Sequence, residues 1–199
     1  MLTIEDFRET GALLTGHFRL SSGLHSDRYL QCARLLQWPA RAEQAGRDLA
    51  ERLSEFDPSV VVSPAMGGII IGHEVARALG VPFLFTERQD GQFALRRGFA
   101  LDPGAAVAIV EDVLTTGKST REVIETLAPL GARPVAVGSI VDRGVGAGAF
   151  PVPSRSLLSL DVPAWKESEC PLCAKGTPVD TPGSRYRPEA PGRVSRPAV

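Results

Sequence analysis

The sequence predicts an α/β protein built on an open, mainly parallel twisted sheet with helices on both faces. Short β-branched runs alternate with longer segments whose apolar residues recur at helical spacing, and this alternation is typical of parallel βαβ units. The unusual polar sequences follow the predicted strands, where open α/β sheets bind their ligands. The chain has 199 residues, which is enough for one such domain with a sizeable core.

The individual elements follow in chain order from these patterns. A helix is predicted from Thr3, with acids in its first turn, and a second one over about 39–56. Further helices are predicted over 67–80 and 117–131, each ending on a glycine. The predicted strands are the apolar and β-branched runs 58–64, 81–85, 105–111 and 133–142.

The composition divides the chain into a folded part and a tail. Residues 1–163 are predicted to form a single domain. From Ala164 onward proline, glycine and polar residues dominate, and residues 164–199 lack the apolar content to fold alone. We therefore expect a C-terminal tail that is extended or mobile.

Charge and hydropathy exclude several classes of function. The net charge is −1, so no basic surface for nucleic acid is predicted. No apolar run approaches the roughly 20 residues of a membrane helix. The first residues carry acids where a signal peptide has positive charge, and we expect a cytoplasmic protein.

The cysteines and histidines do not form a recognisable ligand set in the sequence. Three cysteines are too few and odd in number for a disulfide framework. Cys170 and Cys173 have the spacing of half a zinc site, which leaves structural thiols, a zinc ion shared with another group, and a redox pair as alternatives. His17, His25 and His73 are scattered without metal spacing, so no protein-held metal is predicted.

The stretch "VAIVEDVLTTGKST" (107–120) combines an apolar strand, two acids and a glycine turn that enters a helix. It is not an ATPase phosphate loop, because Asp112 stands where that motif requires glycine. The backbone N–H groups of about 115–119 can still bind a phosphate, assisted by hydroxyl groups. The acids suit a ribose diol, a developing oxocarbenium ion or Mg²⁺, which indicates a ribose 5-phosphate. The alternative is a strand end with solvated acids and a capped helix.

This stretch resembles the phosphoribosyl-diphosphate signature of type I phosphoribosyltransferases. Within that class, the chain is similar to the orotate phosphoribosyltransferase family along nearly its whole length. Residues 11–31 resemble the family's N-terminal hood, which would span about 1–38, and residues 63–79 resemble its diphosphate loop and following helix. "SIVDRG" (139–144) resembles the family's strand ending in Asp-Arg, and the Cys-rich tail resembles a bacterial subgroup.

The resemblance implies transfer of a phosphoribosyl group from 5-phosphoribosyl 1-diphosphate to orotate, with Mg²⁺ as cofactor, in pyrimidine synthesis. Glu111 and Asp112 would be the catalytic residues and would hold the ribose hydroxyls. Orotate would contact Thr115, Arg143 and Tyr29. The diphosphate and 5-phosphate would contact Arg88, Ala65, Met66, Gly67, Gly68, Val113, Leu114, Thr115, Thr116, Gly117, Lys118 and Ser119.

The resemblance also implies a homodimer with shared active sites. The family's mobile loop carries lysines and a histidine, whereas the corresponding loop here has only Arg96 and Arg97 as further cations after Arg88. Asp90-Gly91 is a hairpin-turn signal, so we expect a short ribbon with both arginines near its returning base. Adjacent residues on a strand point to opposite sides, and the sequence does not decide which arginine reaches the ligand.

Several alternatives remain open at this stage. The enzyme could use a purine or another base, although Arg143 and the hood favour orotate. The chain could also be a regulator that senses phosphoribosyl diphosphate, but it has neither a basic surface nor room for a DNA-binding domain. Taken alone, Arg143 could pair with Asp142, Lys118 could point to solvent, and Tyr29 could be ordinary packing.

Overall fold

The computed structural model describes residues 1–20, 22–146 and 148–182, which form two compact units. The larger unit holds Met1–Thr3 and Leu36–Leu160, and the smaller unit holds Ile4–Leu35 and the described residues from Asp161 to Pro182. The described part of the predicted tail thus shares a unit with the predicted hood, because its backbone pairs with that segment. Residues 183–199 of the predicted tail lie outside the described residues.

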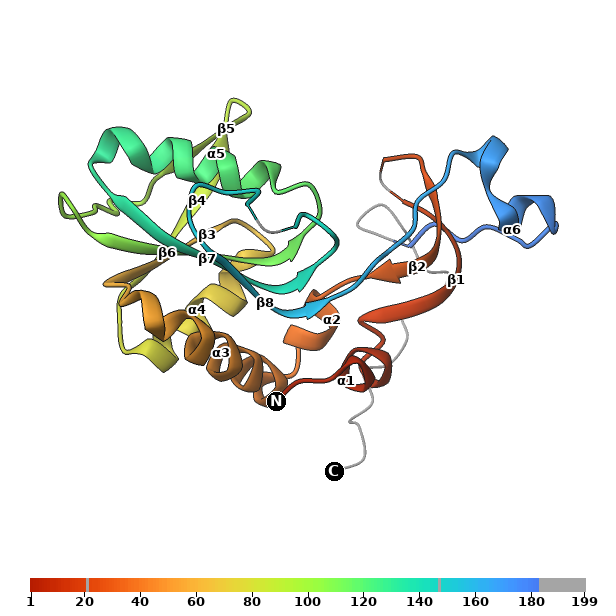
Figure 1. Ribbon diagram of the computed structural model, residues 1–199, viewed down its shortest axis with the longest axis horizontal. Coiled ribbons are helices and arrows are strands. Elements are labelled where there is room, and N and C mark those ends of the chain that lie inside the picture. The colour runs from red at the N-terminus through yellow and green to blue at the C-terminus, as the bar shows by residue number, and fades with distance from the viewer. Residues whose placement is uncertain (21, 147, 183–199) are drawn as a thin grey trace. The chain divides into compact units, whose positions relative to one another are not determined.

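A six-stranded sheet forms the centre of the larger unit and confirms the predicted fold class (Figure 1). The strand order is β5-β4-β3-β6-β7-β8, and every neighbouring pair is parallel except β4 and β5. The strands are β3 (Val60–Pro64), β4 (Phe83–Gln89), β5 (Gln92–Leu95), β6 (Ala106–Leu114), β7 (Arg133–Asp142) and β8 (Ser154–Ser159).

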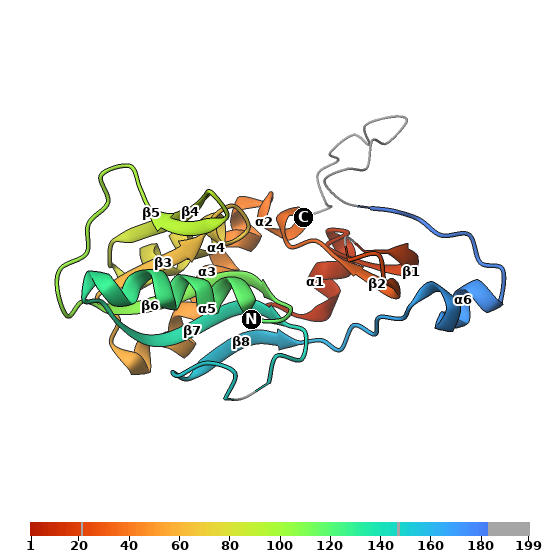
Figure 2. The same ribbon diagram turned by 90° about the horizontal axis from the view of Figure 1, so that it is seen from above.

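Helices cover both faces of this sheet, as Figures 1 and 2 show. On one face lie α3 (Pro39–Leu53) and α4 (Gly68–Leu79), and on the other lies α5 (Lys118–Leu127). The core under α5 consists of apolar side chains from the strands and from one face of the helix, among them Val62, Ile109, Val123, Leu127 and Val137. Burial of this face follows from the helical spacing of the apolar residues in α5.

The predicted elements are present, with shifted ends. The helix predicted over 39–56 is α3 followed by the 3₁₀ turn Ser54–Phe56, and the one predicted over 117–131 is α5 followed by the 3₁₀ turn Ala128–Leu130. The strand predicted to end at Glu111 continues to Leu114, because its last residues pair with β7. The sequence patterns did not predict β8.

The smaller unit contains α1 (Ile4–Glu9) and an antiparallel ribbon of β1 (Leu13–Arg19) and β2 (His25–Leu30). The short helix α2 (Ala33–Leu36) leads to the larger unit. The tail adds the 3₁₀ turn Glu167–Glu169 and the short helix α6 (Pro171–Ala174). Within the described residues, the structure has no helix that is long and apolar enough to cross a membrane.

Helices α3 and α4 approach closely at one glycine. A Cβ atom on Gly46 would lie 2.5 Å from the Cβ of Glu74 and 2.7 Å from its carbonyl carbon. The obstacle is partly backbone, so a side chain at this position would require the two helices to separate.

We therefore expect Gly46→Ala to destabilise the protein. Overpacking typically costs about 1–3 kcal/mol, and the higher helix propensity of alanine offsets up to about 1 kcal/mol, so the net loss should be about 1–2 kcal/mol. Urea unfolding measures the change, with Glu51→Ala on the exposed side of α3 as the control. Unchanged stability in Gly46→Ala would show that the contact does not restrain the helices.

Candidate active site

The carboxyl ends of three adjacent parallel strands lie at one edge of the sheet. β3 ends at Pro64, β6 at Leu114 and β7 at Asp142. Leu114 pairs with Asp142, and the carbonyl of Leu114 accepts a hydrogen bond of 2.9 Å from the N–H of Arg143. The loops that follow these strands are therefore neighbours, at the position where open α/β sheets bind ligands.

The loop after β3 packs against one of the two predicted catalytic acids. A Cβ atom on Gly67 would lie 2.5 Å from Oδ1 of Asp112, and one on Gly68 would lie 2.9 Å from the carbonyl oxygen of Val110. Only glycine permits these approaches without displacing the carboxylate or the strand. Ala65 joins Met66 through a cis peptide bond, and the Met66 side chain is 82% exposed.

Glu111 and Asp112 are both partly buried on β6. Oε2 of Glu111 accepts a hydrogen bond of 2.6 Å from the hydroxyl of Thr120, and Oδ1 of Asp112 accepts one of 3.0 Å from the N–H of Val113. Burial raises the pKa of Glu111 to about 7, against the hydrogen bond from Thr120 and with the help of the neighbouring Asp112 charge. Burial also raises the pKa of Asp112. The fold therefore holds two carboxyl groups in a setting that disfavours their ionisation.

Thr120, which positions Glu111, was not among the predicted site residues. Its side chain is fully buried in the first turn of α5 and bonds a residue nine positions earlier in the chain. The sequence offers no signal for this contact other than the hydroxyl-rich start of the helix.

The phosphate-loop residues form the turn between β6 and α5. Gly117 has φ of +69°, and a Cβ atom there would lie 2.9 Å from the ring of Phe150, so the position requires glycine. The hydroxyl of Thr116 accepts a hydrogen bond of 3.3 Å from the N–H of Lys118. Thr115, Thr116 and Lys118 are exposed. The first N–H groups of α5 lie at this turn, and the N-terminus of a helix favours an anion.

Arg143 follows β7 at the same edge and is partly buried. Its Nε atom is buried without a hydrogen-bond partner among the described residues. Asp142 does not accept a hydrogen bond from this Nε atom. Instead, Oδ1 of Asp142 accepts hydrogen bonds from the N–H groups of Gly144 and Val145 at 2.9 and 2.8 Å. Burial lowers the pKa of the Arg143 guanidinium, yet arginine stays charged in proteins. A partly buried cation thus lies beside the phosphate turn.

The ribbon of β4 and β5 has the predicted Asp90-Gly91 turn, in which both residues have positive φ. Arg88 donates hydrogen bonds of 2.6 Å to Glu122 on α5 and to the carbonyl of Gly91. Lys118 lies 3.7 Å from the same Glu122 carboxylate. Arg88 and Lys118, which were both predicted to contact the ligand, therefore both interact with Glu122 in this structure.

Arg96 and Arg97 lie at the returning base of the ribbon and differ in their surroundings. Arg97 has φ of +60° and binds both carboxylate oxygens of Glu87 at 2.8 Å. Arg96 is exposed and its carbonyl accepts a hydrogen bond of 3.0 Å from the N–H of Phe99, but in the described part of the chain its side chain makes no hydrogen bond or ion pair. Its charge still helps to lower the pKa of Glu87, after the larger effects of Arg97. The structure therefore distinguishes two arginines that the sequence left equivalent.

Tyr29 belongs to the smaller unit. It lies on β2 opposite Leu14, is partly buried, and its ring centroid is 5.9 Å from that of Phe18. Within its own unit, Tyr29 thus packs against an aromatic neighbour, which is the alternative that the sequence left open.

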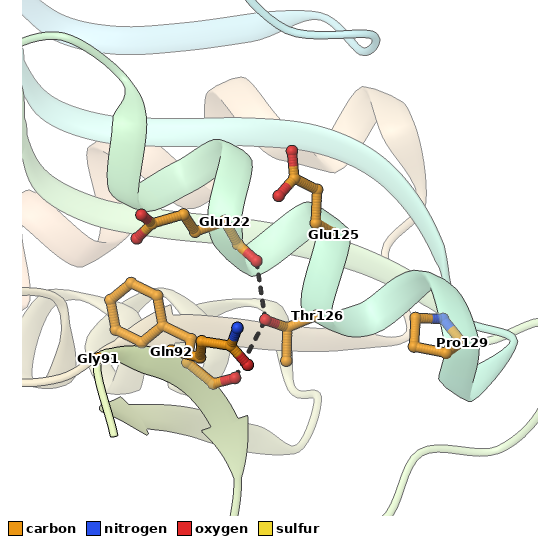
Figure 3. Close-up of a pocket in the computed structure, with 7 residues that line it drawn as sticks. Gly91, Gln92, Glu122, Glu125, Thr126 and Pro129 are labelled. Atoms are coloured by element: carbon orange, nitrogen blue, oxygen red, sulfur yellow. Dashed lines mark hydrogen bonds between the residues drawn. The ribbon is translucent and has the colours of Figure 1, made fainter. Parts of the chain in front are cut away.

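A hollow of about 510 Å³ lies between the β4–β5 ribbon and α5 (Figure 3). Its lining includes Gln92, Glu122 and Thr126, and the Thr126 hydroxyl donates hydrogen bonds to the carbonyls of Glu122 and Phe93 at 2.8 and 3.2 Å. None of the predicted site residues lines it. The candidate site is instead the set of loops at the strand ends.

Comparison with known proteins agrees with this arrangement. Residues 31–151 match the family described as phosphoribosyl transferase domain. The orotate phosphoribosyltransferase of Thermotoga maritima is 52% identical over 181 residues, which cover 91% of this chain and 97% of that protein. The one from Desulforamulus reducens is 49% identical over 182 residues, which cover 92% and 95%.

Solved structures show the same fold. The orotate phosphoribosyltransferase from Aeropyrum pernix has a TM-score of 0.65 at 28% identity, over 80% of this chain and 94% of that chain. An adenine phosphoribosyltransferase from Thermoanaerobacter pseudethanolicus has a TM-score of 0.59 at 18% identity, over 67% and 88%, and so shares the fold alone. With half of its residues identical to full-length relatives and with the signature stretch at the strand ends, this chain belongs to the orotate phosphoribosyltransferase family.

Proposed function

We propose that this protein transfers the 5-phosphoribosyl group from 5-phosphoribosyl 1-diphosphate to orotate in pyrimidine biosynthesis. A bond forms between the anomeric carbon and a ring nitrogen of orotate, the bond from that carbon to the diphosphate oxygen breaks, and the proton of the ring nitrogen is released. The products are orotidine 5'-monophosphate and diphosphate. The names of close relatives over nearly the whole chain support the proposal. In this chain, the observation that carries it is the partly buried Arg143 beside the phosphate turn, whose Nε atom has no hydrogen-bond partner among the described residues.

Arg143 suits a planar carboxylate ligand. Its guanidinium can bind a carboxylate through two parallel hydrogen bonds, and a buried donor without a partner is costly until a ligand supplies an acceptor. Orotate carries such a carboxylate, whereas a purine base does not. This difference favours orotate over a purine base as the substrate. The adenine phosphoribosyltransferase among the similar structures shares only the fold with this chain. The net charge of −1 gives no support to the alternative of a nucleic-acid-binding regulator.

The strand-end loops suit the anionic substrate. The turn Val113–Ser119 would hold the 5-phosphate through N–H groups and hydroxyls, with Thr115 also near orotate, and residues 65–68 would approach the diphosphate with their backbone. Arg88 would exchange its contact with Glu122 for the diphosphate. Tyr29 would lie against the pyrimidine ring.

A cytoplasmic location remains a prediction from the sequence.

Glu111 and Asp112 would hold the ribose hydroxyls and stabilise the positive charge that develops on the ribose ring as diphosphate leaves. They are oriented for this role by Thr120 and the Val113 N–H. Mg²⁺ binds through one or two carboxylates together with substrate phosphates, and the two partly buried carboxylates beside the phosphate turn fit that donor set. When bound, Mg²⁺ would neutralise charge on the departing diphosphate.

Arg96 would complete the diphosphate site of a partner subunit in a homodimer. The diphosphate carries several negative charges, and the two nearby acids add to them. Both arginines are exposed at the base of the β4–β5 ribbon, but Arg97 is hydrogen-bonded to Glu87 in its own subunit, whereas the Arg96 side chain makes no hydrogen bond or ion pair with the described residues. We therefore assign the role in the partner's site to Arg96.

The choice of substrate has a direct test. Arg143→Ala should raise KM for orotate strongly and leave KM for phosphoribosyl diphosphate near normal. Loss of the guanidinium partner of a buried carboxylate costs about 2–5 kcal/mol, or roughly 30-fold to several thousand-fold. Steady-state kinetics measure both constants, with hypoxanthine, adenine and xanthine as competing bases. Arg133→Ala, at the exposed start of the same strand, is the control. An equal loss for both substrates would contradict the assignment.

The raised pKa of Glu111 predicts a pH-dependent stability. A folded pKa of about 7 against an ordinary 4.5 means that the folded state retains a proton that the unfolded state releases as pH rises. The native protein should therefore lose stability between about pH 4.5 and 7 relative to Glu111→Gln, and the difference should level off above pH 7. Partial exposure reduces the effect to the order of 2 kcal/mol.

Urea unfolding of both proteins at pH 5 and pH 8, without substrate or magnesium, measures this difference. Glu125→Gln, which removes an exposed acid from α5, is the control for loss of charge. If the gap between native protein and Glu111→Gln does not change with pH, Glu111 is ionised throughout and the burial argument fails.

Shared active sites can be tested by mixing two inactive variants, Arg96→Ala and Asp112→Asn. A mixed dimer would have one site with both defects and one with neither, so activity should return towards half of native per dimer. Arg97→Ala replaces Arg96→Ala in the control and should retain more activity by itself. If hybrids form without recovered activity, Arg96 acts within its own subunit or not at all.

A further inference from the structure

Four potential metal ligands meet in the smaller unit, and none of them is among the residues assigned to catalysis. His17 lies on β1 and His25 on β2, whereas Cys170 directly precedes α6 and Cys173 lies within it. One ligand atom from each lies within 4.8 Å of all the others. His17, His25 and Cys170 are between 2% and 4% exposed. The fold thus joins histidines that appear scattered in the sequence to the half zinc site formed by the cysteines.

The distances among these atoms approximate the edges of one coordination tetrahedron. Nε2 of His17 lies 2.9 Å from Nδ1 of His25, 3.5 Å from Sγ of Cys170 and 3.6 Å from Sγ of Cys173. Sγ of Cys173 lies 3.2 Å from Nδ1 of His25. The bond lengths of tetrahedral zinc imply edges of about 3.3 Å between nitrogens and about 3.6 Å between nitrogen and sulfur. The two distances from His17 to the sulfur atoms match these edges, and the two that involve Nδ1 of His25 are a few tenths of an ångström shorter. The four atoms are therefore close enough together to bind one zinc ion after a small outward shift.

The hydrogen bond of the other His17 nitrogen sets the tautomer that ligation requires. Nδ1 of His17 lies 2.8 Å from the carbonyl oxygen of Thr177, which can only accept. Nδ1 therefore carries the proton, and in a neutral ring Nε2 presents its lone pair to His25 and the two thiols. Metal-ligating histidines typically donate their second ring N–H to a carbonyl or carboxylate in this way.

The backbone holds these side chains in place. The pairing of β1 and β2 advances from Thr15↔Arg28 to Phe18↔Ser26, so β1 has one extra residue at this point. This bulge lets two consecutive side chains, His17 and Phe18, both be buried, because a bulge re-aims a side chain.

The tail residues that flank the cysteines pair with the two strands. Trp165 exchanges two backbone hydrogen bonds with His25, at 2.7 and 2.8 Å. The N–H of Asp180 donates to the carbonyl of His17 at 2.7 Å, and the carbonyl of Asp180 accepts from Arg19 at 2.8 Å. The tail thus contacts both strands of the ribbon, with the cysteines between the two contacts.

We propose that His17, His25, Cys170 and Cys173 bind one zinc ion, which ties the tail to the β1–β2 ribbon. Two thiolates and two imidazoles are a frequent donor set for structural zinc, and four protein ligands leave no open position for catalysis. The site is distinct in chemistry from the Mg²⁺ of the reaction, which requires oxygen ligands. The proposal departs from the prediction of no protein-held metal, which rested on linear spacing, and takes up the alternative of a zinc ion shared between the two cysteines and another group.

The first experiment measures the metal itself. Protein purified from cells grown with added zinc should contain one zinc ion per chain by elemental analysis. Protein stripped of metal and loaded with Co²⁺ should show the strong visible absorption of tetrahedral cobalt and a thiolate-to-cobalt charge-transfer band. Purified protein without stoichiometric metal, combined with no charge-transfer band, would overturn the proposal and leave a hydrogen-bonded cluster of histidines and thiols.

Variants locate the site. Cys170→Ser/Cys173→Ser should lose the zinc, whereas Cys32→Ala and His73→Ala, which change a cysteine and a histidine outside the cluster, should retain it. If the double variant does not fold, Cys173→His provides the second test, because it should keep the metal while the charge-transfer band of its cobalt form weakens. Zinc retained by a folded double variant, or an unchanged band in Cys173→His, would contradict the assignment.

Removal of the metal should release the tail. Chelation followed by hydrogen exchange should accelerate exchange of the Trp165 and Asp180 amides, which hold the tail to the ribbon, and should leave the amides of β6 and β7 unchanged. Restored zinc should restore protection. Protection of Trp165 and Asp180 that is independent of metal would show that the backbone pairing alone holds the tail.

Discussion

The parallel pairing of β3, β6 and β7 is the constraint on which the candidate active site depends. Each strand ends in a loop with chemistry of its own: glycines after β3, acids and a phosphate turn at β6, and Arg143 after β7. The register places Leu114 beside Asp142, so the phosphate turn and Arg143 leave the sheet at the same level. A register shift of a single residue would also turn each buried face of β6 towards the opposite side. The apolar core therefore fixes the position of the polar site.

The same packing buries two carboxyl groups in the site, which disfavours their ionised forms. The backbone of Gly67 lies so close to Asp112 that a side chain would strike the carboxylate. Burial of Glu111 and Asp112 removes water from both carboxyl groups and raises their pKa values. A ligand with hydroxyl groups and developing positive charge reverses the penalty, because it stabilises the ionised form. The two carboxyl groups therefore cost stability in the free protein, and a ligand of this kind would recover it on binding.

The smaller unit faces a different problem. A two-stranded ribbon alone is marginally stable in water, and α1 and the tail add few apolar side chains to it. The tail strengthens the ribbon by backbone pairing at Trp165 and Asp180. A metal bound by two residues of the ribbon and two of the tail would add binding free energy to folding. Small units without a large core commonly rely on such a cross-link.

The sequence by itself determined the fold class, the family and the identity of the loops at the strand ends, because these follow from local patterns. Apolar periodicity identified the strands and helices, and the stretch at 107–120 identified the phosphate turn and its acids. Asp90-Gly91 identified the ribbon of β4 and β5. Positive φ at Gly117 agrees with the same local signal.

Only the tertiary structure decided which groups from distant parts of the chain meet. Arg96 and Arg97 are equivalent in the sequence, and the left-handed backbone at Arg97 together with Glu87 separates them. His17 and Cys170 are 153 positions apart, and a single bulge in β1 aims one towards the other. The spacing of residues in the sequence predicts contacts within one helix or strand. Contacts between elements depend on the register of the strands and on the path of the chain that connects them.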